Sequence, residues 1–350
     1  MPSLYIHVPF CTSICNYCDF CAMPAPQRLH DEYVDLVLQE LKSAADFNTI
    51  YIGGGSPSAL SVNNLKKLLS ALKTDGEFTM EWNPEQVTDE KIKLALDFGV
   101  NRFSLGAQSL NDCLLKMLGR KHSAKIAMNA LEKLNSAFKT GSCDLMFCLP
   151  NQSTEDFLND VKYLINMDLN HISFYGLTLK KNSKLPPQPE ELYPEMYLKA
   201  TEILQTAGIC RYEISNFAKP GHESKHNLVY WKRGQYLGAG PSAHSYLNGI
   251  RSYVDGKYLQ WKKWVRNGCS KTEITQDIPD SYGKEIEAVW LALRTREGLS
   301  LTSYEQEFGK KFDLEKAEPF IKRKWLTLNG DSLALNGEGW LWLDKILLYF

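Results

Sequence analysis

The sequence predicts an α/β protein, a partial (β/α)6 barrel followed by a smaller C-terminal winged-helix-like domain. Short apolar runs alternate regularly with longer helical patterns, which is typical of βαβ units and a parallel sheet. Polar and glycine-rich stretches follow the apolar runs, at the strand ends where barrels of this kind carry their chemistry. The C-terminal domain is predicted by helical patterns that lead into a short hairpin-like segment.

Six apolar runs are the expected strands of the barrel. They are Leu4–Val8, Thr49–Ile52, Phe78–Trp82, Arg102–Leu105, Asp144–Cys148 and Ile172–Tyr175. The helical patterns between and after them are Asp31–Ala45, Val62–Leu72, Asp89–Phe98, a pair across Asp112–Phe138, Thr154–Met167 and Glu190–Ala207. The six strand ends are then expected to point toward one mouth.

The later part of the chain changes character. The stretch Arg211–Tyr246 is rich in Gly, His, Asn and aromatic residues and is interpreted as an extended functional loop. We therefore expect a barrel with this loop over 1–245, a connecting segment over 246–281 and the winged-helix-like domain over 282–350. In that domain we expect helices followed by a hairpin and a final segment: Ile286–Arg294, Ser303–Phe308, Leu314–Trp325, Trp325–Leu335 and Trp340–Phe350.

Composition and charge argue against several classes of function. The 350 residues carry a net charge of −1, so the charge balance favours neither nucleic acid nor an anionic membrane as a partner. No apolar run approaches the roughly 20 residues that span a bilayer, so any membrane contact is expected to be peripheral. No signal peptide is visible, and the nine cysteines lack the arrangement of a secreted disulfide framework. We expect a reducing cytoplasm.

Three cysteines with the spacing Cys-x3-Cys-x2-Cys follow the first expected strand, at Cys11, Cys15 and Cys18. A short loop of that spacing can fold three thiolates around one corner of a cubane. Three thiolates leave one iron of a [4Fe–4S] cluster open to a substrate or cofactor. A zinc site is the alternative, with Cys21 as the fourth thiolate. Phe20 occupies the Cys-x-Cys position, however, and zinc more often uses paired Cys-x2-Cys knuckles.

Polar groups at the other strand ends suggest a polar ligand. A run of three glycines, residues 53–55, precedes Ser56 and exceeds what a tight turn requires, so it favours close approach of a ligand to the backbone. The run is no dinucleotide fingerprint. Four side chains on or near successive strand ends could hold hydroxyls and charges, although each alone could be a solvated surface group: Glu81, Gln108, Arg120 and Asp144.

Three histidines, His222, His226 and His244, cluster in sequence with Tyr230 and Trp231. A neutral imidazole is a ligand for haem iron or another metal. The alternative is that these histidines are ordinary polar loop residues.

The opening Tyr5-Ile-His-Val-Pro-Phe-Cys11, with the following Cys15-x-Tyr17-Cys18-Asp19-Phe20, resembles that of radical S-adenosylmethionine (SAM) proteins. The closest branch contains the oxygen-independent coproporphyrinogen III dehydrogenases and the related HemW-type haem chaperones. The resemblance covers most of residues 1 to 300 and is weaker in the C-terminal domain. Its further motifs are Gly53–Ser58, Glu81–Pro84, Asn101–Ser109, Leu118–Arg120, Asp144–Pro150 and Tyr212–Trp231.

The resemblance implies a radical SAM barrel with a [4Fe–4S] cluster on Cys11, Cys15 and Cys18. The open iron would chelate SAM, and one electron from a reducing donor would break the bond from the sulfonium to the 5′ carbon. Carried over position by position, the SAM site would be lined by Tyr5, Tyr17, Gly54, Gly55, Ser56, Glu81, Gln108, Arg120 and Asp144.

Two features separate the branches. The dehydrogenases have Cys-x-Cys after the third ligand and a long extension before the cluster, whereas this chain has Phe20 and only ten residues before Cys11. The run His226–Trp231 matches the His-Asn-x-x-Tyr-Trp motif of the haem chaperones, so the resemblance implies that His226 contacts haem as its axial ligand. Cys21 departs from the usual pattern.

We therefore expect a protein that binds haem and delivers it to respiratory or other haem-accepting proteins. The first alternative is an enzyme that oxidatively decarboxylates coproporphyrinogen III. The second is a zinc-stabilised binding module whose winged-helix domain contacts nucleic acid.

Overall fold

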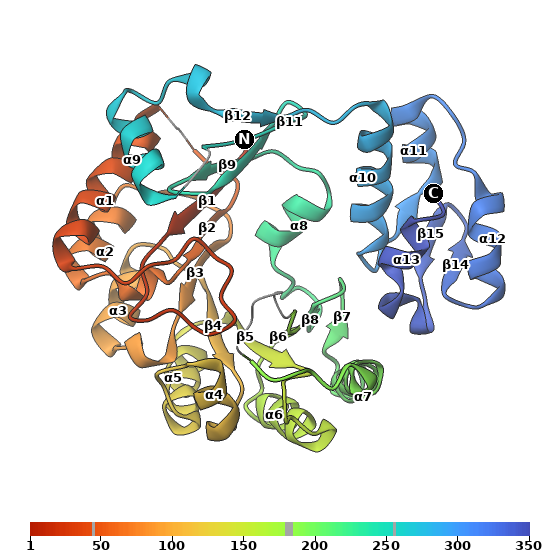
Figure 1. Ribbon diagram of the computed structural model, residues 1–350, viewed down its shortest axis with the longest axis horizontal. Coiled ribbons are helices and arrows are strands. Elements are labelled where there is room, and N and C mark those ends of the chain that lie inside the picture. Colours follow the sequence, from red (N-terminus) through yellow and green to blue (C-terminus); the bar gives the residue numbers. More distant parts are fainter. Residues whose placement is uncertain (44–45, 179–184, 255–256) are drawn as a thin grey trace.

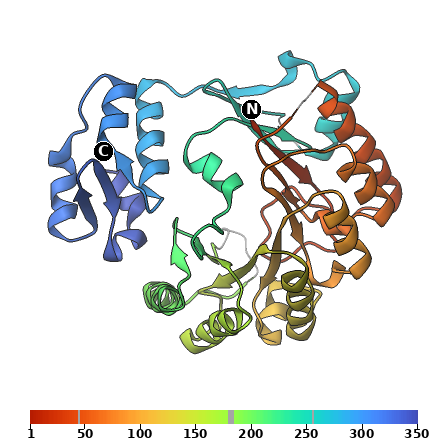
Figure 2. The same ribbon diagram turned by 180° about the vertical axis from the view of Figure 1, so that it is seen from behind.

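The computed structural model describes residues 1–43, 46–178, 185–254 and 257–350. Six parallel strands lie side by side in sequence order at the centre of the sheet. They are β1 (Ser3–Val8), β2 (Ile50–Gly54), β3 (Phe78–Trp82), β4 (Arg102–Gln108), β5 (Thr140–Phe147) and β6 (His171–Gly176). Helices cover the outer face of this sheet (Figures 1 and 2). The expected partial (β/α)6 barrel is confirmed, and its parallel order places six carboxyl ends at one mouth.

The helices of the barrel are α1 (Gln27–Glu40), α2 (Val62–Leu69), α3 (Asp89–Asp97), α4 (Asp112–Leu118), α5 (Ala124–Ala137), α6 (Thr154–Asn166) and α7 (Tyr193–Thr206). Helices α2 to α6 each begin after a Ser, Thr or Asn whose side chain accepts a backbone N–H of the first turn. The first helix begins earlier than expected, directly after Pro26, because the fixed φ of proline suits a helix entrance. It ends at Glu40, a 3-10 turn follows over Leu41–Ser43, and the last two residues of the expected helix, 44 and 45, lie outside the described residues.

The fifth strand also begins earlier than expected, at Thr140. Gly141 and Ser142 are weak strand formers and hide this start in the sequence. Asp144 therefore lies in the middle of β5 instead of at its beginning.

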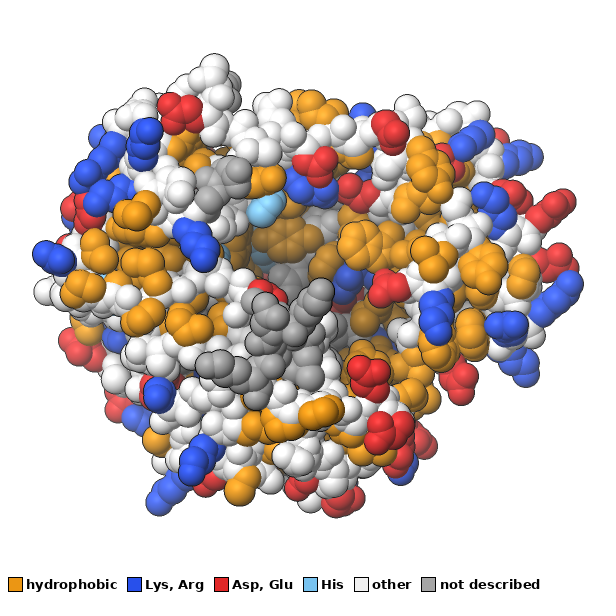
Figure 3. Space-filling view, viewed as in Figure 1, with side chains coloured by type: hydrophobic (Ala, Val, Ile, Leu, Met, Phe, Trp, Pro, Cys, Tyr) orange, Lys and Arg blue, Asp and Glu red, His pale blue; other side chains and the backbone are white. Residues whose placement is uncertain are grey.

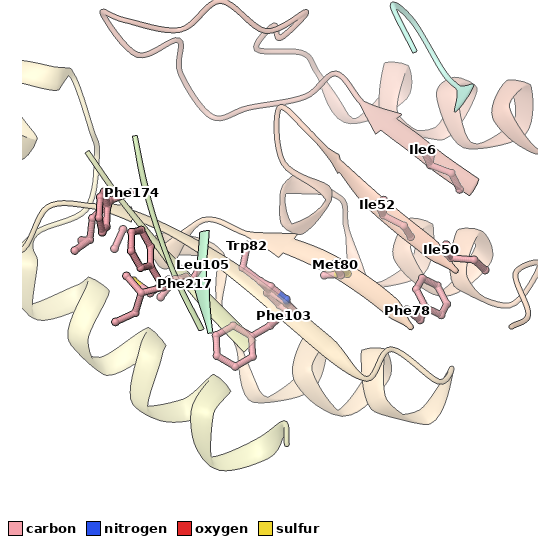
Figure 4. Packing of buried hydrophobic residues seen from close by; sticks show 14 of the residues in the cluster. Ile6, Ile50, Ile52, Phe78, Met80, Trp82, Phe103, Leu105, Phe174 and Phe217 are labelled. Atoms are coloured by element: carbon pink, nitrogen blue, oxygen red, sulfur yellow. The ribbon is translucent and has the colours of Figure 1, made fainter. Parts of the chain in front are cut away.

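Alternation along the strands separates a packed outer face from a polar inner face. On β3, Phe78, Met80 and Trp82 are buried in the core, whereas Thr79 and Glu81 line a cavity inside the barrel. Figure 4 shows core residues on the neighbouring strands, among them Ile6, Ile50, Ile52, Phe103 and Leu105. The inner face is thus left for polar side chains.

Further strands extend the sheet at both edges. Beside β1 lie β9 (Tyr236–Ala239), β10 (His244–Leu247), β11 (Ile250–Tyr253) and β12 (Thr275–Asp277). Beside β6 lie β8 (Asn216–Ala218) and β7 (Cys210–Arg211). A short helix, α8 (Lys225–Trp231), stands in the opening between these two edges (Figures 1 and 2). It carries His226 and both aromatic residues of the motif.

The segment 246–281, expected to be a connection, contributes to the folded core of the barrel. It contains β11, β12 and the helix α9 (Tyr258–Arg266), whose Lys262 Nζ lies 2.8 Å from Glu32 on α1. Residues 255 and 256 of this segment lie outside the described residues. The boundaries at 245 and 281 stay predictions.

The C-terminal part has the expected winged-helix arrangement. Its elements are α10 (Ser281–Leu293), β13 (Leu299–Ser300), α11 (Leu301–Phe308), α12 (Leu314–Lys322), β14 (Leu326–Asn329), β15 (Ser332–Leu335) and α13 (Leu343–Leu347). The hairpin of β14 and β15 pairs with β13 to form a three-stranded antiparallel sheet. Within the described ranges, no helix combines the length and apolar character needed to cross a membrane.

Candidate functional site

A cavity of about 340 Å³ opens at the carboxyl ends of the parallel strands. All three cysteines of the loop line it, together with all but one of the residues expected to contact SAM. These lining residues are Cys11, Cys15, Cys18, Tyr17, Gly54, Gly55, Ser56, Glu81, Gln108, Arg120 and Asp144. The structure thus brings together groups that are far apart in the sequence, and we call this space the first cavity.

The loop that carries the cysteines is held against the barrel. The N–H of Asn16 donates to the carbonyl of the last residue of α4 across 3.0 Å. Nη1 of Arg120 donates to Cys15 Sγ across 3.7 Å. Burial raises the pKa of Cys11 to about 12, and the neighbouring thiols of Cys18 and Cys15 add to the effect. Ionisation of the three thiols that line this cavity would need compensating positive charge, which a metal core would supply.

The glycines at the end of β2 bring bare backbone to the cavity wall. A Cβ on Gly55 would lie 2.7 Å from the carbonyl oxygen of Phe10, and a Cβ on Gly53 would lie 2.8 Å from the Glu81 carboxylate. Gly54 has a φ of +112°, which glycine adopts readily and other residues do not. Its N–H donates to Glu81 Oε2 across 3.1 Å. The glycine run therefore positions Glu81 and leaves room for the cysteine loop to pack against the end of β2.

Two buried carboxyl groups, Glu81 on β3 and Asp144 on β5, face the same interior. Tyr51 donates its hydroxyl to Glu81 Oε1 across 2.7 Å, and Ser104 donates to Asp144 Oδ2 across 3.1 Å. Burial raises the pKa of Glu81 to about 7, and the nearby charge of Asp144 adds to the rise. Burial likewise raises the pKa of Asp144 to about 6, against the hydrogen bonds that it accepts from Ser173 and Ser104. A cationic ligand would relieve the cost of ionising both acids.

Gln108, the last residue of β4, and Arg120, in the turn after α4, both reach the first cavity. Arg120 Nη2 donates to Asn83 Oδ1 across 2.9 Å and to the Gly106 carbonyl across 2.8 Å. Gln108 has a φ of +70° and lies where the register of β4 against β5 shifts, and this bulge redirects its side chain. Asn83 and Tyr51 were not among the predicted site residues. The sequence contained evidence for both, because Asn83 belongs to the Glu-Trp-Asn-Pro motif and Tyr51 holds an inward position on β2.

Tyr5, in contrast, does not line the first cavity. Its hydroxyl lies 3.0 Å from His7 Nδ1, and its ring lies behind that of Tyr51, with 6.1 Å between the ring centroids. The end of the cysteine loop folds over this part of β1, because His7 Nε2 lies 2.8 Å from the Cys21 carbonyl oxygen. Tyr5 faces a second cavity of about 540 Å³. The contact of Tyr5 with SAM stays a prediction.

His226 is completely buried, with 0% of its surface exposed. Its Nδ1 lies 2.7 Å from Thr49 Oγ1 and its Nε2 lies 2.7 Å from Tyr230 Oη. The Thr49 hydroxyl donates its proton to Ser3, so it can only accept a hydrogen bond from His226. Nδ1 of His226 therefore carries the proton, and Nε2 accepts the hydrogen bond from the Tyr230 hydroxyl. Burial lowers the pKa of His226 to about 3, so the ring is neutral near pH 7. Ligation of haem iron by this ring requires Tyr230 to leave Nε2, and the axial position of His226 stays a prediction.

The second cavity adjoins the end of the cysteine loop, where Phe20 and Cys21 line it. Tyr230 and Trp231, at the end of α8, form part of its wall, and Trp290 and Leu291 on α10 form another part. Figure 3 shows that the molecule is hollowed between the sheet and the C-terminal domain, and that hydrophobic side chains gather around this hollow. Phe20 lines both the first and the second cavity.

Comparison with known proteins identifies the family. Residues 5–164 match the Radical SAM superfamily, and residues 286–342 match the HemN C-terminal domain. Heme chaperone HemW of Lactococcus lactis is 33% identical to this chain over 360 aligned residues, which cover 96% of this chain and 94% of the relative. Heme chaperone HemW of Bacillus subtilis is 36% identical over 338 residues, covering 89% and 88%. The chain belongs to the HemW family.

The fold of this HemW-family chain also has a close counterpart among solved structures. Coproporphyrinogen III oxidase (HemN) from Escherichia coli, a radical SAM enzyme, matches 99% of this chain and 89% of its own with a TM-score of 0.86. At 19% identity this likeness shows the shared fold alone.

Membership of the HemW family and the radical SAM superfamily implies a [4Fe–4S] cluster and SAM, and the residues of the first cavity fit both. Three thiols without a fourth cysteine in that cavity suit a cluster with one open iron, as far as the described residues show. The bare backbone after β2 leaves room for a ligand beside the cluster, and Glu81 and Asp144 suit a cationic amino acid. Cys21 lines the second cavity instead, at the end of the loop.

Proposed function

We propose that this protein is a haem chaperone, which binds haem and delivers it to respiratory or other haem-requiring proteins. The observation that carries this proposal is the position of the His226–Trp231 motif. Its two aromatic residues, Tyr230 and Trp231, line the 540 Å³ cavity directly beside the cysteine loop. Relatives that align with almost the whole chain are named heme chaperones, which supports the same function.

In this proposal the two cavities bind different ligands. The first holds the cluster on Cys11, Cys15 and Cys18, with SAM against Glu81 and the glycine run. When bound, these groups supply one-electron chemistry at the SAM sulfonium. The chain itself orients SAM, shields the site and anchors three of the four irons. The second cavity receives haem.

His226 contributes to haem binding by holding Tyr230 in place. The hydrogen bond from Tyr230 to Nε2 fixes the phenol at the cavity wall, and the contact of Nδ1 with Thr49 ties α8 to the barrel. As a direct iron ligand, His226 would have to give up the bond to Tyr230.

The partners in this proposal are haem, a haem-accepting protein and a reducing electron donor. A cytoplasmic location suits a cluster bound by thiolates, because such a cluster needs reducing surroundings. The near-zero net charge gives nucleic acid no electrostatic support as a partner.

The test is anaerobic reconstitution of the full chain with iron and sulfide, followed by titration with ferric haem b. We expect stoichiometric haem binding, and transfer of that haem to the apo form of a respiratory haem protein, seen by the absorption of the acceptor. The variant with Cys11→Ala, Cys15→Ala and Cys18→Ala should lose the absorption of the cluster. Absence of stoichiometric haem binding by the reconstituted protein would rule out the chaperone function.

The same preparation tests the alternative enzyme activity. Incubation with coproporphyrinogen III, SAM and a reductant should produce no protoporphyrinogen IX. Formation of that product would favour the decarboxylation activity over the chaperone function. The structural likeness to coproporphyrinogen III oxidase rests on fold and does not favour it.

A further inference from the structure

We propose that the second cavity is the haem site and that Nε2 of His244 is the iron ligand within it. This inference rests on the proposed function, which already places haem in the second cavity, and adds the iron ligand to it. Four features of the cavity support it: its aromatic walls, the state of the His244 ring, the cations at its edge and its relation to the cysteine loop.

The cavity has the size and lining of a site for a flat, largely apolar molecule. Its volume of about 540 Å³ lies within the range of roughly 300–1,000 Å³ that is common for cofactor sites. Aromatic rings from the cysteine loop, β1, α8, β9, β10 and α10 converge on it, and such faces stack well against a conjugated macrocycle. These residues are Tyr5, Phe20, Tyr230, Trp231, Tyr236, Tyr246 and Trp290.

Two of these rings are exposed to solvent. Phe20 is 70% exposed and Trp290 is 40% exposed, although both are large and apolar. They come from the cysteine loop and from α10, which are far apart in the sequence. A bound macrocycle would cover both rings and recover the free energy of burying them.

His244 is prepared to bind a metal through one nitrogen. It lies two residues before Tyr246 on β10, so both side chains point to the same face, and both line the second cavity. Its Nδ1 lies 3.2 Å from the Ser242 carbonyl oxygen. A carbonyl can only accept, so Nδ1 carries a proton, and in the neutral ring this leaves the lone pair on Nε2. A backbone carbonyl on the second nitrogen is the usual partner of a metal-binding histidine.

The contrast with His226 concerns the same atom. Nε2 of His226 accepts a hydrogen bond from Tyr230, and its ring is 0% exposed. Nε2 of His244 has no hydrogen-bond partner among the described residues, and its side chain is exposed at the cavity. Binding of iron at Nε2 of His244 would therefore break no hydrogen bond of the described structure.

The cavity wall also carries two arginines that could pair with acidic substituents on the ligand, although carboxylates, Glu287 among them, line it as well. Arg233 and Arg251 line it, each paired with a carboxylate: Arg233 with Glu307 at 2.8 Å and Arg251 with Glu287 at 3.0 Å. Two donors on this wall, Arg233 Nε and Trp231 Nε1, are buried and have no hydrogen-bond partner among the described residues. Carboxylate substituents such as the two propionates of haem are acceptors that suit guanidinium and indole donors.

The position beside the cysteine loop links this site to the first cavity. Phe20 is shared by both cavities, and Cys21 lines the second one. A macrocycle in the second cavity would therefore lie against the end of the loop that carries the cluster.

The test is a ferric haem b titration of the anaerobically reconstituted full chain, in the wild type and in four variants, one of which is His226→Ala. His244→Ala should weaken haem binding by about tenfold or more and remove the nitrogen-ligand signature in the electron paramagnetic resonance spectrum. His244→Met should keep haem bound with a shifted Soret band, since a thioether replaces imidazole. The matched control is His222→Ala, because His222 lies outside this cavity, with Nδ1 3.0 Å from Thr140 Oγ1.

The outcomes separate the inference from the proposed function. If the wild type binds haem but His244→Ala and His244→Met leave both affinity and spectra unchanged, the inference is wrong and the chaperone function stands. Loss of haem binding in His226→Ala together with unchanged binding in His244→Ala would identify His226 as the iron ligand. If the wild type binds no haem, both proposals fail. Near-ultraviolet circular dichroism and the iron content report whether a variant is folded, and His244→Met carries the test if His244→Ala is not.

Discussion

Tyr230 Oη lies 2.7 Å from Nε2 of His226, one turn further along the same helix. This relationship explains the spacing of the His-Asn-x-x-Tyr-Trp motif. Side chains four residues apart meet on one face of a helix, so the tyrosine covers the imidazole nitrogen that would otherwise be free. The motif therefore builds a hydrogen-bonded pair, and the aromatic residues at its end face the second cavity.

The first prediction concerns this pair. Tyr230→Phe leaves Nε2 of His226 buried without its donor, so we expect the free energy of unfolding to fall by about 1–3 kcal/mol. Urea denaturation of the apo chain measures it. Tyr163→Phe is the matched control, because the Tyr163 hydroxyl makes no hydrogen bond in the described structure. An equal effect in both variants would contradict the importance of the pair.

The second prediction concerns pH. The pKa of His226 is about 3 in the folded chain and about 6.5 when unfolded. Between these values the unfolded chain binds more protons, so His226 lowers stability as pH falls below about 6.5, by up to about 1.4 kcal/mol per pH unit. His226→Gln should remove this slope from plots of unfolding free energy against pH. Glu81 and Asp144 have raised pKa values and opposite slopes, so the wild-type curve is compared with the variant directly. Parallel curves would show that His226 is not the responsible group.

The third prediction concerns the SAM site. The pKa of Glu81 is about 7 without ligand, and a cationic ligand binds the ionised carboxylate. SAM affinity should therefore rise as the pH increases through about 7, and Glu81→Gln should lower it by about tenfold or more and flatten this dependence. Isothermal titration of the cluster-loaded chain measures both effects. Glu132→Gln, on the exposed face of α5, is the control. A pH dependence that survives in Glu81→Gln would assign it to another group.

The fourth prediction concerns how the C-terminal domain is joined to the barrel. Glu213 is 0% exposed and lies 2.7 Å from Nη2 of Arg294, whose guanidinium stacks 3.8 Å from the centroid of the Trp231 ring. Arg294→Met leaves the buried Glu213 carboxylate without its partner, so we expect the free energy of unfolding to fall by about 3–5 kcal/mol.

A double-mutant cycle tests this coupling. Arg294→Met combined with Glu213→Gln should cost less than the sum of the two single changes, because no unpaired charge remains. The exposed pair Lys93 and Asp97 provides the comparison, with an expected loss below about 1 kcal/mol. Additive effects at Arg294 and Glu213 would contradict the coupling.

Much of the first cavity could be predicted because its signals are local. The cysteine spacing, the glycine run after β2 and the polar residues at the strand ends each lie within a few residues of a strand end, and a parallel barrel gathers such ends at one mouth. Gln108 shows the limit, since the bulge that redirects its side chain is visible only in the register of β4 against β5.

The sequence by itself determined the alternation of strands and helices, the three-cysteine loop and the winged-helix order, because periodicity and residue spacing act over short distances along the chain. Only the tertiary structure decided which cavity Tyr5 faces and that His226 is buried. The partner of His226 Nδ1 is Thr49, 177 residues away, and the wall of the second cavity combines the cysteine loop with α10. Burial and hydrogen bonding depend on which distant segments pack together. The residue pattern of a single segment does not specify its packing partners.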